Sequence, residues 1–510
     1  MNGRLPHILL VMVDQLAASF LRAYGHPVTK TPTIDRLAED GVVFTNAYTP
    51  SPLCAPARAA FMTGALPTRT GVYDNAAELS SSIPTFAHYL RLEGYRTCLS
   101  GKMHFVGADQ LHGFEERLTT DVYPGDFGWT PDWRRPDERV DSWYHNMSSV
   151  KEAGVAEITN QLEYDDEVAF LAIRRLYDHA RYERDAPLFL CVSFSHPHDP
   201  YVARPRYWDL YSDEEIDLPA APARPPAELD AHSLRLWKGS AMDEVEVTED
   251  DVRAVRHGYY ASLSYVDEKI GEVLAALGAC GLADETIVLF VSDHGDLLGE
   301  HGLFYKMSFY ENACRVPLVV HAPGRYAPRR VDQPVSLVDF LPTLADLARP
   351  GLSNDLACAV DGRSLVPLLE GDPEDPDATV VGEYLAECVP HPMVMIRRGR
   401  WKFVHVPGDP DQLFDLESDP RELVNLAEDA GHAGPVTELR EEVARRWDLE
   451  AVERSVRESQ LARLTVFPAL QRGKPQPWDF QPSRASAEQY VRNTMDVTER
   501  DQQSRFPPAR

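Results

Sequence analysis

The chain has 510 residues, of which 44% are hydrophobic and 26% are charged, and these are the proportions of a globular protein rather than a disordered or fibrous one. The formal net charge of -29 argues against nucleic acid and anionic membranes as partners, because both require clustered Lys and Arg. No stretch approaches the roughly 20 apolar residues of a membrane span.

The cysteines and the N-terminus bear on the cellular compartment. The seven cysteines are odd in number and show no paired spacing, so we expect neither a disulfide framework nor a zinc site. The first apolar run, Ile8 to Val13, is too short for a secretory signal and lacks a cleavage-site pattern. The sequence therefore predicts a cytoplasmic protein with reduced thiols.

Four apolar segments predict buried parallel strands, and each leads into polar residues. The segments are His7 to Val13, Thr97 to Ser100, Leu188 to Phe194 and Thr286 to Val291. The polar residues that follow them are Asp14, Lys102, His104, His196, His198, Asp293 and His294. Because open α/β sheets bind ligands outside the carboxyl ends of their strands, we expect these side chains to share one crevice. Amphipathic helices are predicted over Asp165 to Tyr182 and Tyr259 to Leu277.

The run from Cys54 to Gly64 reads Cys-Ala-Pro-Ala-Arg-Ala-Ala-Phe-Met-Thr-Gly. Its proline and alanines predict a short helix that begins near Ala55, with Gly64 as the stop. Cys54 then lies where a helix N-terminus attracts anions, and Arg58 follows on the same helix face. The run taken alone is equally compatible with a buried cysteine beside a surface arginine.

The pattern changes after about residue 375. Met393 to Arg398 and Trp401 to Val406 predict a hairpin around Gly399, followed by a helical stretch from Val436 to about Leu464. The tail from Arg472 is either disordered or an arm that docks on another subunit. Residues 200 to 256, with many Pro, Asp and Glu, predict an irregular surface excursion. We expect a catalytic domain over 1–375, a smaller α+β subdomain with an antiparallel sheet over 376–470, and an extended oligomerisation tail over 471–510.

The donor types predict one metal site. Asp14, Asp293 and His294 are each compatible with an ordinary helix cap or turn. Together with Cys54 they form a set of hard oxygen donors and one imidazole, which suits Ca²⁺, Mg²⁺ or Mn²⁺ better than zinc. The histidine segments are candidates for acid–base chemistry, whereas Lys306 could equally be a solvated lysine.

Five blocks, in this order, resemble the type I sulfatases. They are Val13-Asp14-Gln15, Ser51-Pro52-Leu53-Cys54-Ala55-Pro56-Ala57-Arg58, Ser100-Gly101-Lys102-Met103-His104, Pro197-His198-Asp199-Pro200 and Ser292-Asp293-His294-Gly295-Asp296. The resemblance implies an alkaline-phosphatase-like α/β fold, with a large, mostly parallel mixed sheet flanked by helices. Further blocks over residues 73–78, 109–121, 126–131 and 156–167 resemble the choline sulfatases.

That resemblance implies a mechanism. A formylglycine-generating enzyme converts Cys54 to formylglycine, whose hydrated gem-diol attacks the sulfur of choline-O-sulfate. Calcium, or else Mg²⁺ or Mn²⁺, binds residue 54 with Asp14, Asp293 and His294. Cations neutralise the sulfate, His198 with Lys306 protonates the choline oxygen, and His104 removes a proton when sulfate leaves. The cations are Arg58, Lys102 and Lys306.

The resemblance also implies a pocket for the quaternary ammonium, and a homotetramer whose tails reach neighbouring subunits. Trp129 supplies an aromatic face and Glu387 a carboxylate, unless Trp129 is merely packed in its loop. The pocket wall is formed by Asn75, His145 and Asn146. In the tail, Thr498 stands where an acidic residue is expected, so either Asp496 or Glu499 substitutes for it or the cation site is weaker.

Three rival functions stay open at the level of sequence. The first is a phosphonate monoester or phosphodiester hydrolase, which would share the nucleophile, the metal and the Asp-Gln start. The second is a sulfatase for another small alkyl sulfate. The third is a catalytically silent choline-binding protein in which Cys54 stays a thiol.

Overall fold

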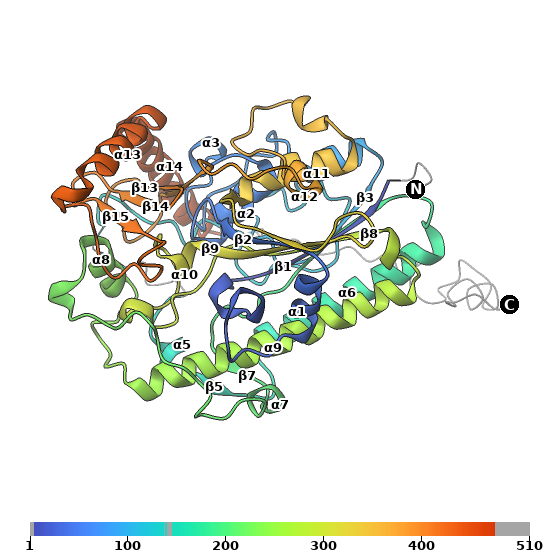
Figure 1. Ribbon diagram of the computed structural model, residues 1–510, viewed down its shortest axis with the longest axis horizontal. Coiled ribbons are helices and arrows are strands. Elements are labelled where there is room, and N and C mark those ends of the chain that lie inside the picture. Colours follow the sequence, from blue (N-terminus) through green and yellow to red (C-terminus); the bar gives the residue numbers. More distant parts are fainter. Residues whose placement is uncertain (1–4, 137, 140–144, 475–510) are drawn as a thin grey trace.

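The computed structural model describes residues 5–136, 138–139 and 145–474. Its centre is a nine-stranded sheet in the order β10-β2-β9-β8-β1-β6-β3-β4, with β11 beside β2 (Figure 1). All pairings in it are parallel except those of β9 with β2 and β8, so the predicted mostly parallel mixed sheet is confirmed. The strands are β1 (His7–Val13), β2 (Val42–Tyr48), β3 (Arg96–Gly101), β4 (Glu116–Arg117), β6 (Leu188–Ser193), β8 (Thr286–Ser292), β9 (Arg315–His321), β10 (Arg329–Val331) and β11 (Val335–Ser336).

Helices cover both faces of this sheet (Figure 1). In β1, Leu9 and Val11 face the core formed with α1, α6 and α9, whereas Leu10 and Met12 face the core formed with α2, α4, α11 and α12. Burial on both sides explains why the strand is apolar throughout. These helices are α1 (Pro32–Glu39), α2 (Cys54–Thr63), α4 (Phe86–Leu92), α6 (Asn160–Tyr182), α9 (Glu249–Ala279), α11 (Phe340–Ala348) and α12 (Val366–Glu370). Shorter helices are α3 (Pro67–Thr70), α5 (Ser148–Lys151) and α10 (Glu311–Cys314).

A second, antiparallel sheet follows in the order β12-β13-β14-β15. One of its faces packs against α13, and the other adds Met393, Met395 and Val404 to the main core. The predicted hairpin around Gly399 is confirmed by the pairing of β13 with β14. The elements are β12 (Thr379–Tyr384), β13 (Met393–Arg398), β14 (Trp401–His405), β15 (Gln412–Asp415), α13 (Ala433–Arg446) and α14 (Leu449–Leu470).

The expectation of an irregular excursion over residues 200–256 holds for 209–225 and 240–248, which contain no helix or strand, and is wrong for the rest. This stretch contains β7 (Val202–Ala203), which pairs with β5 (Gly154–Val155), and the helices α7 (Pro205–Trp208) and α8 (Ala231–Gly239). It also contains the first residues of α9, which starts ten residues before the predicted Tyr259. Thr248 and Asp251 form a capping box there, so the acidic residues at this point start a helix instead of a loop.

The helical stretch predicted from Val436 to about Leu464 is two helices rather than one. The chain leaves the helical conformation at Trp447, the C-cap of α13, and Asp448 caps the start of α14. The Trp447 indole donates a hydrogen bond of 2.7 Å to Glu383. A buried tertiary contact therefore coincides with the break, which local sequence does not reveal.

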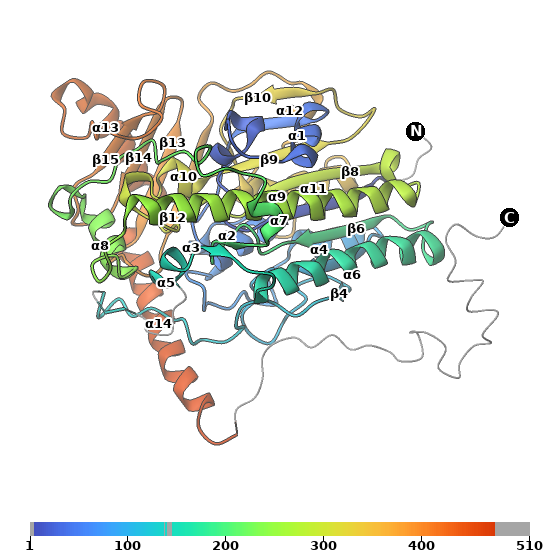
Figure 2. The same ribbon diagram turned by 90° about the horizontal axis from the view of Figure 1, so that it is seen from below.

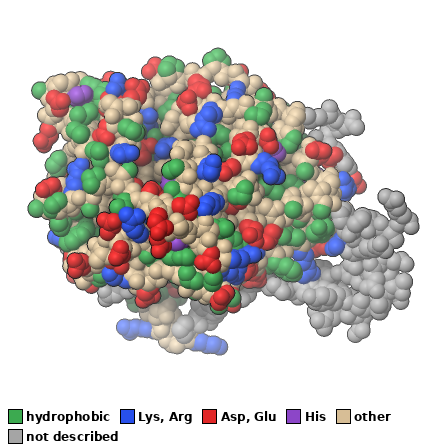
Figure 3. Space-filling view, turned by 60° about the horizontal axis from the view of Figure 1, so that its bottom comes forward, with side chains coloured by type: hydrophobic (Ala, Val, Ile, Leu, Met, Phe, Trp, Pro, Cys, Tyr) green, Lys and Arg blue, Asp and Glu red, His purple; other side chains and the backbone are tan. Residues whose placement is uncertain are grey.

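Three further observations concern the cysteines, the helices and the surface. All seven cysteines are free, six of them buried. No helix among the described residues is both long and apolar enough to cross a membrane. On the face drawn in Figure 3, Lys and Arg side chains are scattered among Asp and Glu side chains, so the described part of that face has no continuous basic surface.

Candidate active site

Four neighbouring strands bring the site together. Strands β8, β1, β6 and β3 lie side by side and parallel, so their carboxyl ends meet at one edge of the sheet. Asp14 follows β1, Lys102 follows β3 and Asp293 follows β8. The predicted convergence of polar residues that follow strands is therefore what the structure shows, although His196 turns aside to bond Asp165 of α6 at 2.6 Å.

Cys54 lies at the first position of helix α2, and Gly64 ends the helix in the left-handed region with φ of 66°. Both ends are as the sequence predicts. Every residue of this helix is buried, including Arg58, so the surface-arginine alternative is wrong. Asn75 accepts a hydrogen bond of 2.9 Å from the Ala55 amide and thereby satisfies part of the helix start.

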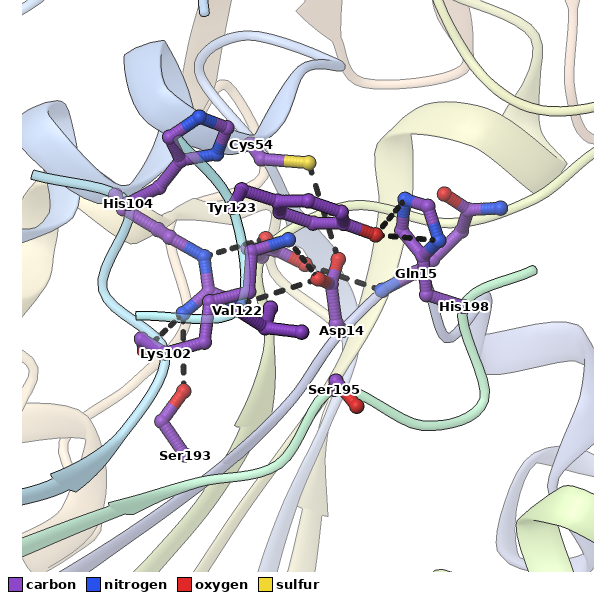
Figure 4. A network of polar contacts seen from close by, with 12 residues as sticks. Asp14, Gln15, Cys54, Lys102, His104, Val122, Tyr123, Ser193, Ser195 and His198 are labelled. Atoms are coloured by element: carbon purple, nitrogen blue, oxygen red, sulfur yellow. Dashed lines mark hydrogen bonds and ion pairs between the residues drawn. The ribbon is translucent and has the colours of Figure 1, made fainter. Parts of the chain in front are cut away.

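The four expected metal ligands form one buried cluster. Asp14, Cys54, Asp293 and His294 each offer a ligand atom within 4.8 Å of the others. The Cys54 sulfur is 3.1 Å from Nε2 of His294. It is also 4.0 Å from Oδ1 of Asp14, a contact that Figure 4 shows. The other ring nitrogen of His294, Nδ1, lies 3.1 Å from the carbonyl of Gly295 and can donate to it, which leaves the Nε2 lone pair directed at the cluster.

Three buried cations surround this cluster. Arg58 donates to Asp293 at 2.8 Å and to the carbonyl of Lys102 at 2.7 Å. The Lys102 ammonium contacts Asp14 and lies 4.2 Å from the centre of the Tyr123 ring. Lys306 donates to Gln15 and to Nε2 of His198, the latter at 2.9 Å. The cations and carboxylates compensate one another, as buried charges require.

The cations favour negative charge at residue 54. Burial alone would raise the pKa of the Cys54 thiol, but Lys102 and Lys306 hold it well below its usual range. Burial would likewise raise the pKa of Asp14, and Lys102 brings it well below the ordinary value. An anionic group placed at Cys54 is therefore stabilised by the surrounding protein.

Two histidines lie to either side of Cys54 and Tyr123 in Figure 4. His198 is held through Nδ1, which lies 2.8 Å from the carbonyl of Asp199 and 3.1 Å from the Tyr123 hydroxyl. His104 is only 4% exposed, and its side-chain hydrogen bond with Cys54 helps to lower the pKa of that thiol. The imidazole of His104 therefore faces residue 54.

The residues expected around the cation fall close to this site. The Trp129 ring centre is 6.1 Å from that of His104 and 5.6 Å from that of Tyr123. His145 stacks on His198 at 5.5 Å, and the carbonyl of Asn146 accepts from the Tyr305 hydroxyl. Glu387 has a buried oxygen with no hydrogen-bond partner in the described chain. Asp496 lies outside the described residues.

Sequence reasoning missed several residues of the site. Gln15 joins Lys306 to Asp296, to which its amide donates at 2.6 Å. Asp121 accepts from the backbone amides of Met103 and His104 at 3.0 and 2.8 Å and so fixes the chain after β3. Gln15 could have been found, because it follows Asp14 at a strand end. Tyr123 and Asp121 lie in a long loop, where nothing in the sequence signals their placement.

Family comparisons cover nearly the whole chain. A family model described as Sulfatase matches residues 6–350, and one described as N-sulphoglucosamine sulphohydrolase, C-terminal, matches residues 299–448. A third, described as Choline sulfatase enzyme C terminal, matches residues 454–506. The matches follow one another along the chain with a single overlap.

Individual relatives agree with these matches. A choline-sulfatase of Rhizobium meliloti (strain 1021) is 52% identical over 98% of both chains. A multifunctional alkaline phosphatase superfamily protein of Trinickia caryophylli is 28% identical and covers 88% of this chain and 96% of its own. The crystal structure of a phosphonate monoester hydrolase of Agrobacterium radiobacter superposes with a TM-score of 0.68 at 27% identity, over 88% of this chain and 96% of that one. By its family match and its relatives, this chain belongs to the sulfatase family.

Proposed function

We propose that this protein is a sulfuric ester hydrolase that cleaves choline-O-sulfate to choline and sulfate. The observation that carries the proposal is the Trp129 ring, 6.1 Å from the His104 ring, beside the buried cations around Cys54. Glu387 is a buried carboxyl that interacts with the charges of Lys306 and Cys54. The choline-sulfatase relative and the match over residues 454–506 support it. A sulfate ester of a cationic alcohol carries a negative sulfate for the buried cations and a positive group for the aromatic ring and the carboxylate.

The sulfate half is assigned to Arg58, Lys102 and Lys306. All three are buried, and each is already held by hydrogen bonds to carboxylate, carbonyl or amide oxygens. Their positions are therefore set before substrate arrives, and fixed charges stabilise a transition state without a cost of reorganisation. Arg58 also donates to Ser193 at 2.9 Å, which fixes the plane of its guanidinium.

We assign the metal to residue 54 with Asp14, Asp293 and His294, and we expect Ca²⁺, with Mg²⁺ or Mn²⁺ as alternatives. The cluster fits such an ion, because two carboxylates and an imidazole lone pair converge within 4.8 Å and these donors suit a hard cation. A bound divalent metal, with Cys54 converted to formylglycine, would supply a hydroxyl nucleophile of lowered pKa. The protein itself contributes the orientation of these groups and the exclusion of water.

Proton transfers are assigned to the two histidines. Lys306 donates to Nε2 of His198, so this pair can deliver a proton to the oxygen of the departing choline. His104, whose side chain hydrogen-bonds with Cys54, takes up a proton at residue 54 when sulfate is released. Separate donor and acceptor residues suit a reaction that needs both roles.

The choline half is assigned to Trp129 and Glu387, with Asn75, His145, Asn146 and Asp496 completing the wall. A trimethylammonium group cannot donate an N–H hydrogen bond, so an aromatic face and a carboxylate are its natural partners. Burial, and then the positive charge of Lys306, hold the pKa of His145 well below its ordinary value. His145 is therefore neutral and does not repel a cation.

The decisive experiment compares kcat/KM for choline-O-sulfate, an uncharged aryl sulfate and a phenyl phosphonate monoester. We expect choline-O-sulfate to be the best substrate. The likeness to phosphonate monoester hydrolases favours the second candidate, a phosphonate monoester or phosphodiester hydrolase, and a preference for the phosphonate would establish it. Binding of choline without turnover of any ester would indicate a silent choline-binding protein.

Three further parts of the proposal concern the cellular setting. Maturation requires a formylglycine-generating enzyme as a partner. Seven free cysteines suit a cytoplasmic location, where thiols stay reduced. We also propose a homotetramer, in which residues 471–510 serve as the oligomerisation arm of a chain divided at about 375 and 470.

A further inference from the structure

Helix α14 contacts the chain segments that carry the proposed cation pocket. Figure 2 shows it running away from the C-terminal sheet, past the loop that follows β4. Arg457, Gln460 and Arg463 recur at a spacing of three residues and so point from one side of the helix. Each of the three bonds to a pocket segment, so this side of α14 is a common support for them.

Arg463 makes the most extensive of these contacts. Its guanidinium donates to both oxygens of Asp74, at 2.6 and 2.7 Å, and to the hydroxyl of Thr130 at 3.1 Å. Asp74 is fully buried and Arg463 is 6% exposed. A bidentate pair between buried partners fixes both direction and distance. Asn75 and Trp129 are the direct chain neighbours of Asp74 and Thr130.

Two more residues of α14 hold the remainder of the Trp129 loop. Gln460 accepts from the Trp133 amide at 2.9 Å, and Arg457 donates to the Trp133 carbonyl at 2.7 Å. The Trp133 indole in turn donates to the carbonyl of Ala386 at 2.6 Å, next to Glu387. The helix is thereby connected to the segments of Asn75, Trp129 and Glu387 at once.

The position of these residues in the chain is informative. Arg457, Gln460 and Arg463 fall in the segment that matches the choline sulfatase C-terminal model, whereas the sulfatase match ends at residue 350. The cations and metal ligands assigned above all lie within the sulfatase match. The residues of α14 that support the leaving-group pocket therefore lie in a different part of the sequence from the residues assigned to sulfate cleavage.

We propose that Arg463 is a positioning residue that sets selectivity for a cationic leaving group. It acts through Asp74 and Thr130 on the placement of Asn75 and Trp129, and it does not itself touch the substrate. The inference rests on the proposed choline-O-sulfate activity. Loss of Arg463 should therefore reduce the discrimination between choline-O-sulfate and an uncharged aryl sulfate.

The test must avoid leaving Asp74 as an unpaired buried charge, which would destabilise the fold. We would compare Arg463→Met, the charge-neutral pair Asp74→Asn with Arg463→Met, and Arg463→Lys, which keeps the charge without the planar fork. Arg454→Met is the matched control, because Arg454 is an exposed residue of the same helix. For each variant, kcat and KM are measured on choline-O-sulfate and on 4-nitrophenyl sulfate, and thermal unfolding is recorded.

In the charge-neutral pair we expect the ratio of kcat/KM for choline-O-sulfate to that for the aryl sulfate to fall by about tenfold, chiefly through KM, because displaced binding groups lose much of their effect. Arg454→Met should leave the ratio unchanged. Combined with Trp129→Ala, Arg463→Met should change the ratio by less than it does in the wild-type background, since part of its effect acts through Trp129.

Equal losses on both substrates in a folded variant would overturn the inference, as would a ratio that falls as far in the Trp129→Ala background as in the wild-type background. If Arg463→Met alone does not fold, the charge-neutral pair and Arg463→Lys decide the matter. A wild-type enzyme without preference for choline-O-sulfate would instead overturn the proposed function.

Discussion

The sulfur of Cys54 lies 3.1 Å from Nε2 of His294, although 240 residues separate them in the chain. The helix start that carries Cys54 and the strand end that carries His294 therefore meet at the proposed metal site. This contact places the reactive side chain against the proposed metal ligands. It also makes the state of residue 54 the first quantity to measure.

We expect Cys54 to be converted to formylglycine in active protein. Replacement of CH₂SH by CHO lowers the mass of the peptide that contains residue 54 by about 18 Da relative to the unmodified sequence. Peptide mass spectrometry of the purified enzyme checks this, and a Cys54→Ala variant serves as the inactive control. Active protein in which every such peptide retains cysteine would contradict the proposed nucleophile.

We expect one divalent ion per chain, with calcium the commonest. Elemental analysis of enzyme exchanged into metal-free buffer measures the stoichiometry directly, without reference to activity. Asp14→Asn should lower the bound metal by at least about tenfold, because a carboxylate ligand is lost from a buried site. A metal content unchanged in this variant would remove Asp14 from the ligand set.

Glu387→Gln should raise KM for choline-O-sulfate by about tenfold or more, because the cation loses a buried countercharge. KM for 4-nitrophenyl sulfate should change little, since that leaving group carries no positive charge. Steady-state kinetics on the two substrates measure the difference. Glu383→Gln is the comparison for a buried carboxyl, since Glu383 accepts from Thr68 and Trp447 instead. Parallel losses on both substrates would exclude Glu387 from the cation pocket.

The pH dependence of choline binding provides a second test of Glu387. Burial raises its pKa to about 8, so the carboxyl carries a proton at neutral pH when no cation is bound. The dissociation constant for choline should fall as pH rises from 6 to 8, by up to about tenfold per unit, as the ionised form becomes available. Calorimetric titrations at several pH values measure it, and Glu387→Gln should give a flatter profile.

The raised pKa of Glu387 affects folding stability in the opposite direction: choline binding strengthens as pH rises, whereas stability falls. Between pH 4.5 and about 8 the folded protein holds this proton and the unfolded chain releases it. The stabilising contribution is therefore full below the ordinary pKa of 4.5 and is lost as pH rises through 8. Denaturant unfolding at several pH values gives the free energy of unfolding, which should fall with rising pH more steeply for wild type than for Glu387→Gln. The same pH dependence in both proteins would contradict the raised pKa.

His198→Asn should affect poor leaving groups most. Removal of a general acid costs roughly 10²- to 10⁴-fold when the departing oxygen must be protonated, as it must in choline. An aryl sulfate with an acidic phenol needs little protonation and should lose much less. A series of sulfate esters of graded leaving-group pKa measures this dependence. A uniform loss along the series would assign His198 to substrate binding instead.

The strands and helix α2 were open to prediction because their causes are local. The run His7 to Val13 is apolar at every position, as a strand covered on both faces requires, and it is β1. Proline near the start and Gly64 at the end are local signals that delimit α2. In contrast, the break at Trp447 accompanies a hydrogen bond to Glu383, 64 residues away, and no local pattern reports such a bond.

The sequence by itself determined the chemical types at the ends of the strands and their order along the chain, and thereby the sulfate half of the proposed site. Continuous apolar runs followed by polar residues suffice for this, because such runs are local and open α/β sheets bind ligands at the carboxyl ends of their strands. Only the tertiary structure decided how Tyr123, Trp129 and Glu387 approach that site and that Arg463 of α14 stands behind them. Those positions depend on long loops held by distant hydrogen bonds, and loops carry no periodicity from which to read their course.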